Sequence, residues 1–139
     1  MIRILIADDH PLVRQGLRSI INESGPLEIV GEAENGKETI QLVEELDPDL
    51  VILDISMPYL NGIEATREIH KKGARTRILI LSMFSDYYLV KGALEAGAEG
   101  YLLKRLVGEE LIPAIYQVNE GHVYLSHGLG NDVKGLPTG

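Results

Sequence analysis

Short apolar runs alternate with amphipathic segments five times along the chain. The runs have the length of strands and cover Ile2–Ala7, Leu27–Ala33, Asp49–Ile55, Arg77–Ser82 and Gly100–Leu103. The first, third and fourth are almost continuous in Ile, Leu and Val, which is typical of strands buried on both faces of a parallel sheet. The second is more polar and contains Gly31, so we expect it at an edge of the sheet.

Helical periodicity fills the segments between the runs. Apolar residues recur three or four positions apart, as in Leu111, Ile115 and Val118, which predicts helices with one buried face. Five strand–helix units in succession predict an α/β fold with an open, doubly wound parallel sheet. Residues 126–139 lose the pattern and include four glycines. We therefore expect one domain over residues 1–125, followed by a flexible tail or a truncated linker.

Composition narrows the classes of function. The 139 residues contain no Cys and carry a formal net charge of −8. This charge disfavours a nucleic-acid-binding surface on the chain, and the absence of Cys excludes disulfides and zinc thiolates. The acidic pair Asp8–Asp9 comes too early for a signal peptide, and no apolar run has the length of a membrane span. We expect a soluble, cytoplasmic protein that does not contact membranes.

Polar side chains follow the predicted strands where each one ends. They are Asp8, Asp9, Asp54, Ser82 and Lys104. Each alone has an ordinary explanation as a helix cap, a turn residue or a surface charge. Because the carboxyl ends of parallel strands share one edge of the sheet, we expect the five to converge. Three carboxylates that meet repel one another, so their convergence needs a positive partner.

A divalent cation would be such a partner. Mg²⁺ prefers hard oxygen ligands, which the three carboxylates and the backbone carbonyl of Ser56 could supply. A metal ion, an ammonium and a hydroxyl suit phosphoryl transfer, which needs positioning and charge neutralisation. Hydrolysis of a phosphate ester and covalent transfer of phosphoryl to a carboxylate both remain open. The scattered histidines are set aside as non-catalytic; they are His10, His70, His122 and His127.

The motifs at these positions resemble the receiver domain of two-component response regulators, especially of the LuxR/NarL-type subfamily. The similarity covers residues 2–125 and includes ILIADDHPLVRQGL, PDLVILDISMPYLNGIEATREI and ILILSMFSDYYLVKGALEAGAEGYLLK. The resemblance implies a flavodoxin-like (βα)5 sandwich with strand order 2-1-3-4-5. It also implies a regulatory phosphoacceptor domain, rather than an enzyme, that promotes its own phosphorylation and dephosphorylation.

The resemblance implies a role for each matching residue. Asp54 would accept a phosphoryl group from a sensor histidine kinase. Asp8, Asp9, Asp54 and the Ser56 carbonyl would hold Mg²⁺. Lys104 would pair with the phosphoryl oxygens, and Ser82 would donate its hydroxyl to them. Tyr101 would be the switch aromatic, whose ring moves inward when Ser82 is drawn to the phosphoryl group. A homodimer is left open.

The sequence departs from the family in two places. Arg105 follows Lys104 where many receivers have Pro, and no helix-turn-helix follows Ser126. DNA binding is therefore expected only through an output domain that is absent from this chain, in a parent that regulates transcription. A truncated receiver and a natural stand-alone receiver are both open.

Two other classes of function are weighed against the receiver. A Mg²⁺-dependent phosphatase with an aspartyl-phosphate intermediate would need a residue between the two carboxylates of Asp8 and Asp9. A flavin or nucleotide module would need a Gly-rich or Ser/Thr-rich phosphate loop after the first strand. That loop here reads ADDHPLV and presents negative charge.

Overall fold

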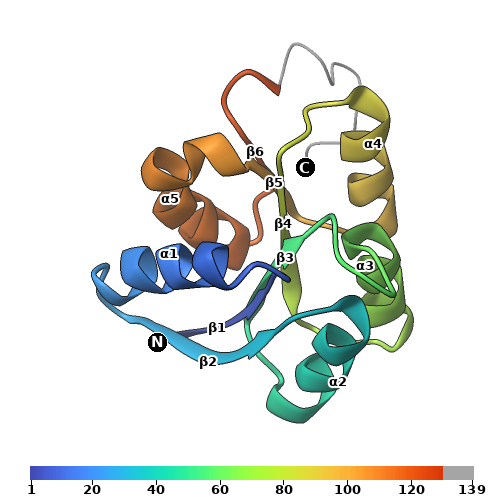
Figure 1. Ribbon diagram of the computed structural model, residues 1–139, viewed down its shortest axis with the longest axis horizontal. Helices are drawn as coiled ribbons and strands as arrows, with labels where there is room; N and C mark the ends of the chain where they lie inside the picture. Colours follow the sequence, from blue (N-terminus) through green and yellow to red (C-terminus); the bar gives the residue numbers. More distant parts are fainter. Residues whose placement is uncertain (130–139) are drawn as a thin grey trace.

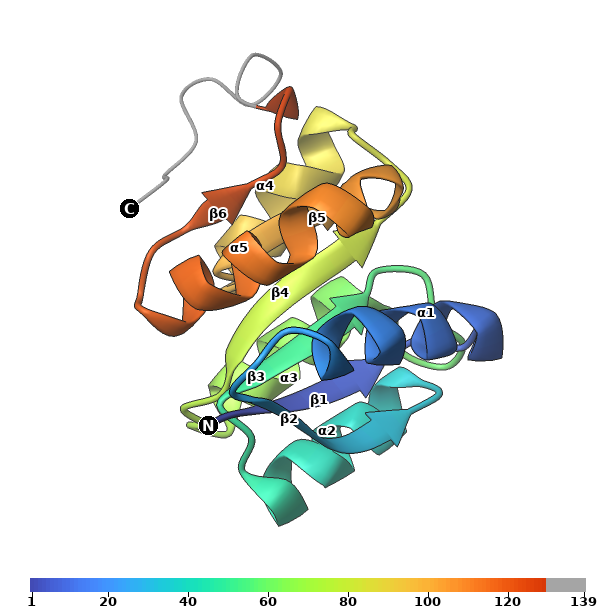
Figure 2. The same ribbon diagram turned by 90° about the vertical axis from the view of Figure 1, so that its left-hand side faces the viewer.

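The computed structural model describes residues 1–129, in which a six-stranded parallel sheet forms the centre (Figures 1 and 2). The strand order is β2-β1-β3-β4-β5-β6. The strands are β1 (Ile2–Ala7), β2 (Leu27–Ala33), β3 (Leu50–Asp54), β4 (Arg77–Ser82), β5 (Gly100–Leu103) and β6 (Tyr124–Leu125). The helices are α1 (Pro11–Asn22), α2 (Gly36–Leu46), α3 (Gly62–Lys71), α4 (Tyr87–Ala96), the 3₁₀ turn η1 (Lys104–Leu106) and α5 (Val107–Asn119).

The predicted architecture is confirmed, with one strand added. The first five strands have the expected order, and β2 lies at an edge of the sheet. The sixth strand, β6, was not predicted, because two residues are too few to show a period of two. It pairs with β5 through Gly100 opposite Tyr124 and Tyr101 opposite Leu125.

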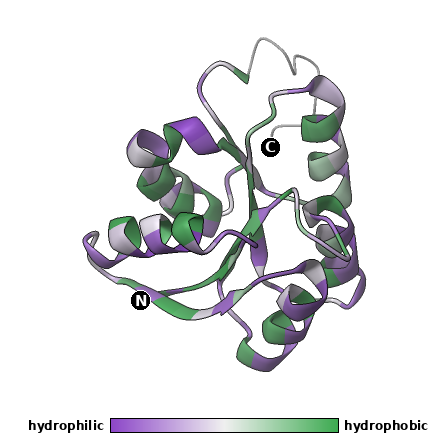
Figure 3. Cartoon of the chain, viewed as in Figure 1, coloured by the Kyte–Doolittle hydropathy of each residue, from purple (hydrophilic) through white to green (hydrophobic). Residues whose placement is uncertain are grey.

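Two apolar layers hold the helices against the sheet. One layer joins α1 and α5 to the sheet, with Leu17 and Leu111 among its buried residues. The other joins α2, α3 and α4 to the opposite face, with Val43, Ile69 and Val90 in its core. The strands are largely coloured as hydrophobic in Figure 3, whereas the helices show both colours. This pattern explains the continuous apolar runs of β1, β3 and β4, which are covered on both faces.

Side-chain caps fix the start of two of the helices that follow the strands, α2 at Asn35 and α3 at Asn61. Asn61 accepts a hydrogen bond from the backbone N–H of Glu64, and the Glu64 carboxylate accepts the N–H of Asn61. This capping box fixes the start of α3 directly after the loop that follows β3. Helix α1 begins with Pro11, and His10 occupies its N-cap position without a capping bond from its side chain.

The packed chain extends past the predicted domain boundary at residue 125. Ser126 and Leu129 are each 1% exposed, because Ser126 bonds to β5 and Leu129 packs into the apolar layer that contains α4. The rest of the predicted tail, residues 130–139, lies outside the described residues. In the described part of the chain, every helix is too short or too polar to cross a bilayer.

Candidate functional site

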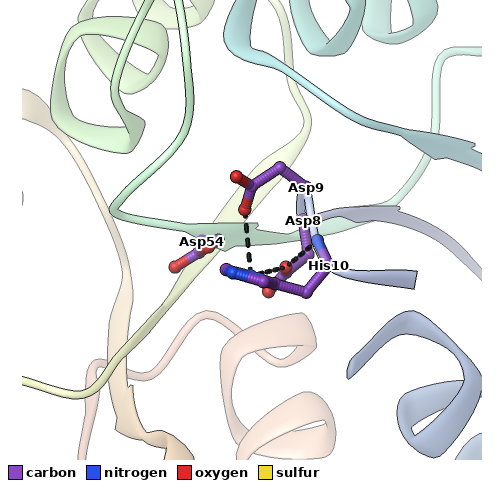
Figure 4. A group of neighbouring side chains, drawn as sticks. All are labelled: Asp8, Asp9, His10 and Asp54. Carbon is purple, nitrogen blue, oxygen red and sulfur yellow. Dashed lines mark hydrogen bonds and ion pairs between the residues drawn. The ribbon is translucent and has the colours of Figure 1, made fainter. Parts of the chain in front are cut away.

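Four side chains meet at the carboxyl edge of the sheet (Figure 4). Asp8 and Asp9 follow β1, His10 begins the turn into α1, and Asp54 ends β3. Each offers one possible ligand atom, and these atoms lie within 4.8 Å of one another. Asp8 and Asp54 are buried, with exposures of 0% and 1%. The structure thus brings together the three carboxylates that the strand-end argument expected to converge.

Lys104 approaches this cluster from the end of β5. It is the first residue of η1, and its Nζ lies 3.4 Å from Asp8 Oδ2 and 3.4 Å from Asp54 Oδ1. Its side chain is 18% exposed, so solvent screens these ion pairs only in part. One ammonium faces three carboxylates, and the cluster keeps an excess of negative charge.

His10 also belongs to the cluster, although its scattered place among the histidines of the sequence predicts no such role. Its Nδ1 lies 3.1 Å from Asp8 Oδ1 and 3.0 Å from Asp9 Oδ1, and its backbone N–H donates to Asp8 Oδ1 at 2.8 Å. Arg14, one turn into α1, donates to the backbone carbonyl of Asp8. The signal in the sequence was position: His10 directly follows Asp9, and Arg14 stands four residues later, in the first turn of α1.

Three carboxylate oxygens in the cluster are buried without a hydrogen bond from the described residues: Asp8 Oδ2, Asp9 Oδ1 and Asp54 Oδ2. Asp8 Oδ2 has only its longer contact with Lys104, and Asp9 Oδ1 has only its contact with His10. Buried oxygens without donors are costly, and hard oxygen atoms are the ligands that Mg²⁺ prefers. The donor set therefore fits Mg²⁺, which Asp8, Asp9 and Asp54 would hold.

The protonation of Asp54 reflects its surroundings. Burial, and then the charge of Asp8, raise the pKa of Asp54 from 3.8 to about 6, whereas Lys104 and the backbone N–H of Ser56 act in the opposite direction. That N–H donates to Asp54 Oδ1 at 3.3 Å. The carbonyl of Ser56 as a metal ligand stays a prediction. Near neutral pH, Asp54 is mostly ionised and open to a positive partner.

Ser82 and Tyr101 meet at the loop that follows β4. Both are buried. The Ser82 hydroxyl accepts the backbone N–H of Phe84 at 2.9 Å, and the Tyr101 hydroxyl donates to the Phe84 carbonyl at 2.7 Å. Burial raises the pKa of Tyr101, which keeps its hydroxyl protonated as a donor. Among the described residues, the Ser82 hydroxyl bonds to the backbone of Phe84 and not to Asp54.

Comparison with known protein families shows the family of this chain. The family model for the response regulator receiver domain matches residues 4–116. The chain belongs to this family. The receiver is a regulatory module rather than a classical enzyme, and its carboxylate cluster occupies the edge where the fold positions ligands.

The receiver is similar to regulators of the NarL and LuxR type, as the motifs predicted. It is 41% identical over 126 residues to the nitrate/nitrite response regulator protein NarL of Escherichia coli K12, covering 91% of this chain and 58% of NarL. A LuxR-family two-component response regulator from Aurantimonas sp. SI85-9A1 superposes with a TM-score of 0.90 at 37% identity, over 94% of both chains. The receiver domain of Mycobacterium tuberculosis NarL superposes with a TM-score of 0.84 at 32% sequence identity, over 86% of this chain and 97% of that domain.

The receiver spans little more than half the length of the curated relatives that it matches. These relatives include proteins named as transcriptional regulators, such as DegU of Brevibacillus brevis. Two-component signalling and transcription regulation are therefore the setting of the family.

Proposed function

We propose that this receiver accepts a phosphoryl group on Asp54 from a phosphohistidine of a sensor kinase, in a Mg²⁺-dependent reaction. The change would switch an output surface in a transcription regulator that binds DNA through another domain and dimerises. The observation that carries the proposal is the state of Asp54. Its carboxylate is buried, one oxygen has no hydrogen-bond donor among the described residues, and Lys104, Asp8 and Asp9 surround it.

Each residue of the cluster has a different role in the phosphoryl transfer. A carboxylate oxygen of Asp54 forms a bond to phosphorus while the bond from phosphorus to the donor imidazole breaks, and the imidazole nitrogen takes up a proton. Lys104, 3.4 Å from Asp54, pairs with the phosphoryl oxygens as a flexible point charge. Asp8 and Asp9 hold Mg²⁺, which supplies charge neutralisation when it is bound.

The contacts of Phe84 support Ser82 and Tyr101 as the switch. A phosphoryl group adds negative charge and acceptor oxygens beside the end of β4. If Ser82 turns its hydroxyl toward them, the Phe84 N–H loses its partner, and the loop must rearrange to satisfy it. Tyr101 holds the carbonyl of the same residue. Phosphorylation would therefore shift the population of loop conformations and of Tyr101 together.

A labelling experiment tests the acceptor. With acetyl phosphate and Mg²⁺, we expect one phosphoryl group per chain, which hydroxylamine removes because it is an acyl phosphate. Asp54→Asn removes the nucleophilic oxygen and should abolish the label. Asp49→Asn changes an exposed aspartate in the same way and should leave the label intact. Undiminished labelling of Asp54→Asn would contradict the assignment, and steady turnover of an ordinary phosphomonoester would favour the phosphatase.

A further inference from the structure

The segment after α5 is part of the folded receiver. Strand β6 extends the sheet beside β5, and its pairing ends at Leu125 opposite Tyr101. The chain then continues along the end of β5 toward the carboxyl edge of the sheet, where the cluster lies (Figure 2).

Ser126 brackets the end of β5 with two hydrogen bonds. Its backbone N–H donates to the carbonyl of Tyr101 at 3.0 Å, and its hydroxyl oxygen accepts the backbone N–H of Leu103 at 2.8 Å. Leu103 is 4% exposed, so its N–H needs a partner inside the protein. Strand β6 has already ended at this point, and the serine hydroxyl takes the place of the missing strand carbonyl.

Two further contacts hold Ser126 in place. The Glu110 carboxylate on α5 accepts the backbone N–H of His127 at 3.1 Å. On the other side, Leu129 packs into the same apolar layer as Tyr101 and Leu103. The segment is thus fixed both at the surface and in the core.

The two hydrogen bonds of Ser126 matter for the site because of where Leu103 lies in the chain. The next residue is Lys104, which reaches both Asp8 and Asp54 from the first position of η1. We propose that Ser126 is a positioning residue for Lys104: it fixes the backbone of Leu103 and so sets where the ammonium meets the phosphoryl group. The inference rests on the proposed role of Asp54. Small displacements of a charged group at a reacting centre slow the reaction strongly.

The experiment compares Ser126→Ala with wild type in phosphorylation by acetyl phosphate at saturating Mg²⁺. We expect a severalfold lower rate constant, because Lys104 is then held less well beside Asp54. The affinity for Mg²⁺, from an NMR titration, should not fall, because the carboxylates stand on β1 and β3, and an ammonium that shifts away from them removes positive charge from their surroundings. Ser126→Thr keeps the hydroxyl and should restore the rate.

Thr76→Ala is the matched control. Thr76 is also a buried hydroxyl residue bonded to the backbone, through Pro48 at 2.8 Å, but it precedes β4 at the opposite edge of the sheet. Its loss should leave both the rate and the Mg²⁺ affinity unchanged. If Ser126→Ala does not fold, Glu110→Ala loosens the same segment from the surface, and the rate should again fall while the Mg²⁺ affinity holds.

The outcomes separate the two proposals. If wild type takes no label on Asp54, the proposed function fails. If wild type is labelled and Ser126→Ala matches its rate, or if rate and Mg²⁺ affinity fall together, the positioning role of Ser126 is wrong and the acceptor assignment stands.

Discussion

At the scale of single residues, the ionised carboxylate of Asp54 carries a cost in the folded protein. Its pKa of about 6 lies above the ordinary value of 3.8, so the folded chain binds this proton more tightly than the unfolded chain does. The free energy of unfolding therefore falls as the pH rises from the unfolded pKa through the folded one. Below that window the carboxyl is neutral in both states and the cost disappears.

Asp54→Asn should relieve this cost. The amide is neutral and can still accept a hydrogen bond from Lys104. Without Mg²⁺ at about pH 7.5, we expect the variant to be more stable than wild type by up to about 3 kcal/mol. Urea unfolding measures the difference, which should shrink toward zero near pH 4. Asp49→Asn is the control, and its free energy of unfolding should change little at either pH. Equal stability of wild type and Asp54→Asn at neutral pH would show that the ionised Asp54 carries no such cost.

The sequence predicts some site residues better than others. Asp8, Asp9, Asp54 and Lys104 were predictable because they stand at strand ends, and the strand topology alone brings strand ends together. The place of His10 in the cluster was not predictable, because the direction of a side chain in a turn depends on local backbone angles that a hydrophobic pattern does not contain.

At the scale of elements, α3 packs directly on the backbone of β3. A Cβ placed on Gly62 would lie 2.6 Å from the carbonyl oxygen of Asp54 and 2.8 Å from the Cα of Ile55. Both atoms belong to the main chain and cannot turn aside as a flexible side chain would. The close approach of the first residue of α3 to Asp54 therefore depends on a glycine.

Gly62→Ala should push α3 away from the end of β3. We expect a loss of stability of about 1–3 kcal/mol from overpacking, together with slower labelling by acetyl phosphate because Asp54 is displaced. Thermal unfolding and the labelling rate measure the two effects. Gly16→Ala in α1 is the matched control, since nothing lies within 4 Å of the added methyl group, and it should stabilise the fold by up to about 1 kcal/mol. Equal behaviour of the two variants would exclude the packing argument.

Element prediction succeeded for the five strands of the apolar runs. Strands β1, β2, β4 and β5 have the predicted bounds, and β3 is one residue shorter at each end than the predicted run. It missed β6 and the docked segment after it, because the burial of Ser126 and Leu129 comes from tertiary contacts with β5 and α4. No local pattern in a Gly-rich segment indicates such contacts.

At the scale of the whole molecule, negative charge can attract Mg²⁺ in two ways, through the net charge of the chain and through the local cluster of carboxylates. The net charge of −8 attracts any cation weakly and is screened by salt, whereas the cup of Asp8, Asp9 and Asp54 holds its oxygens within one ion's reach. Mg²⁺ that binds only the folded chain raises the free energy of unfolding by mass action. Protons compete for Asp54, so this stabilisation should weaken as the pH falls through about 6.

Thermal unfolding in Mg²⁺ separates attraction by the net charge from binding at the carboxylate cluster. We expect Mg²⁺ to raise the Tm of wild type at about pH 7.5 and to raise it much less near pH 5, relative to NaCl at equal ionic strength. Asp8→Asn and Glu28→Gln each remove one negative charge, the first inside the cup and the second from the exposed surface of β2. Asp8→Asn should lose most of the Mg²⁺ shift, and Glu28→Gln should keep it. Equal shifts in both variants would mean that the overall charge attracts the ion, and that the convergence of strand ends does not build a site.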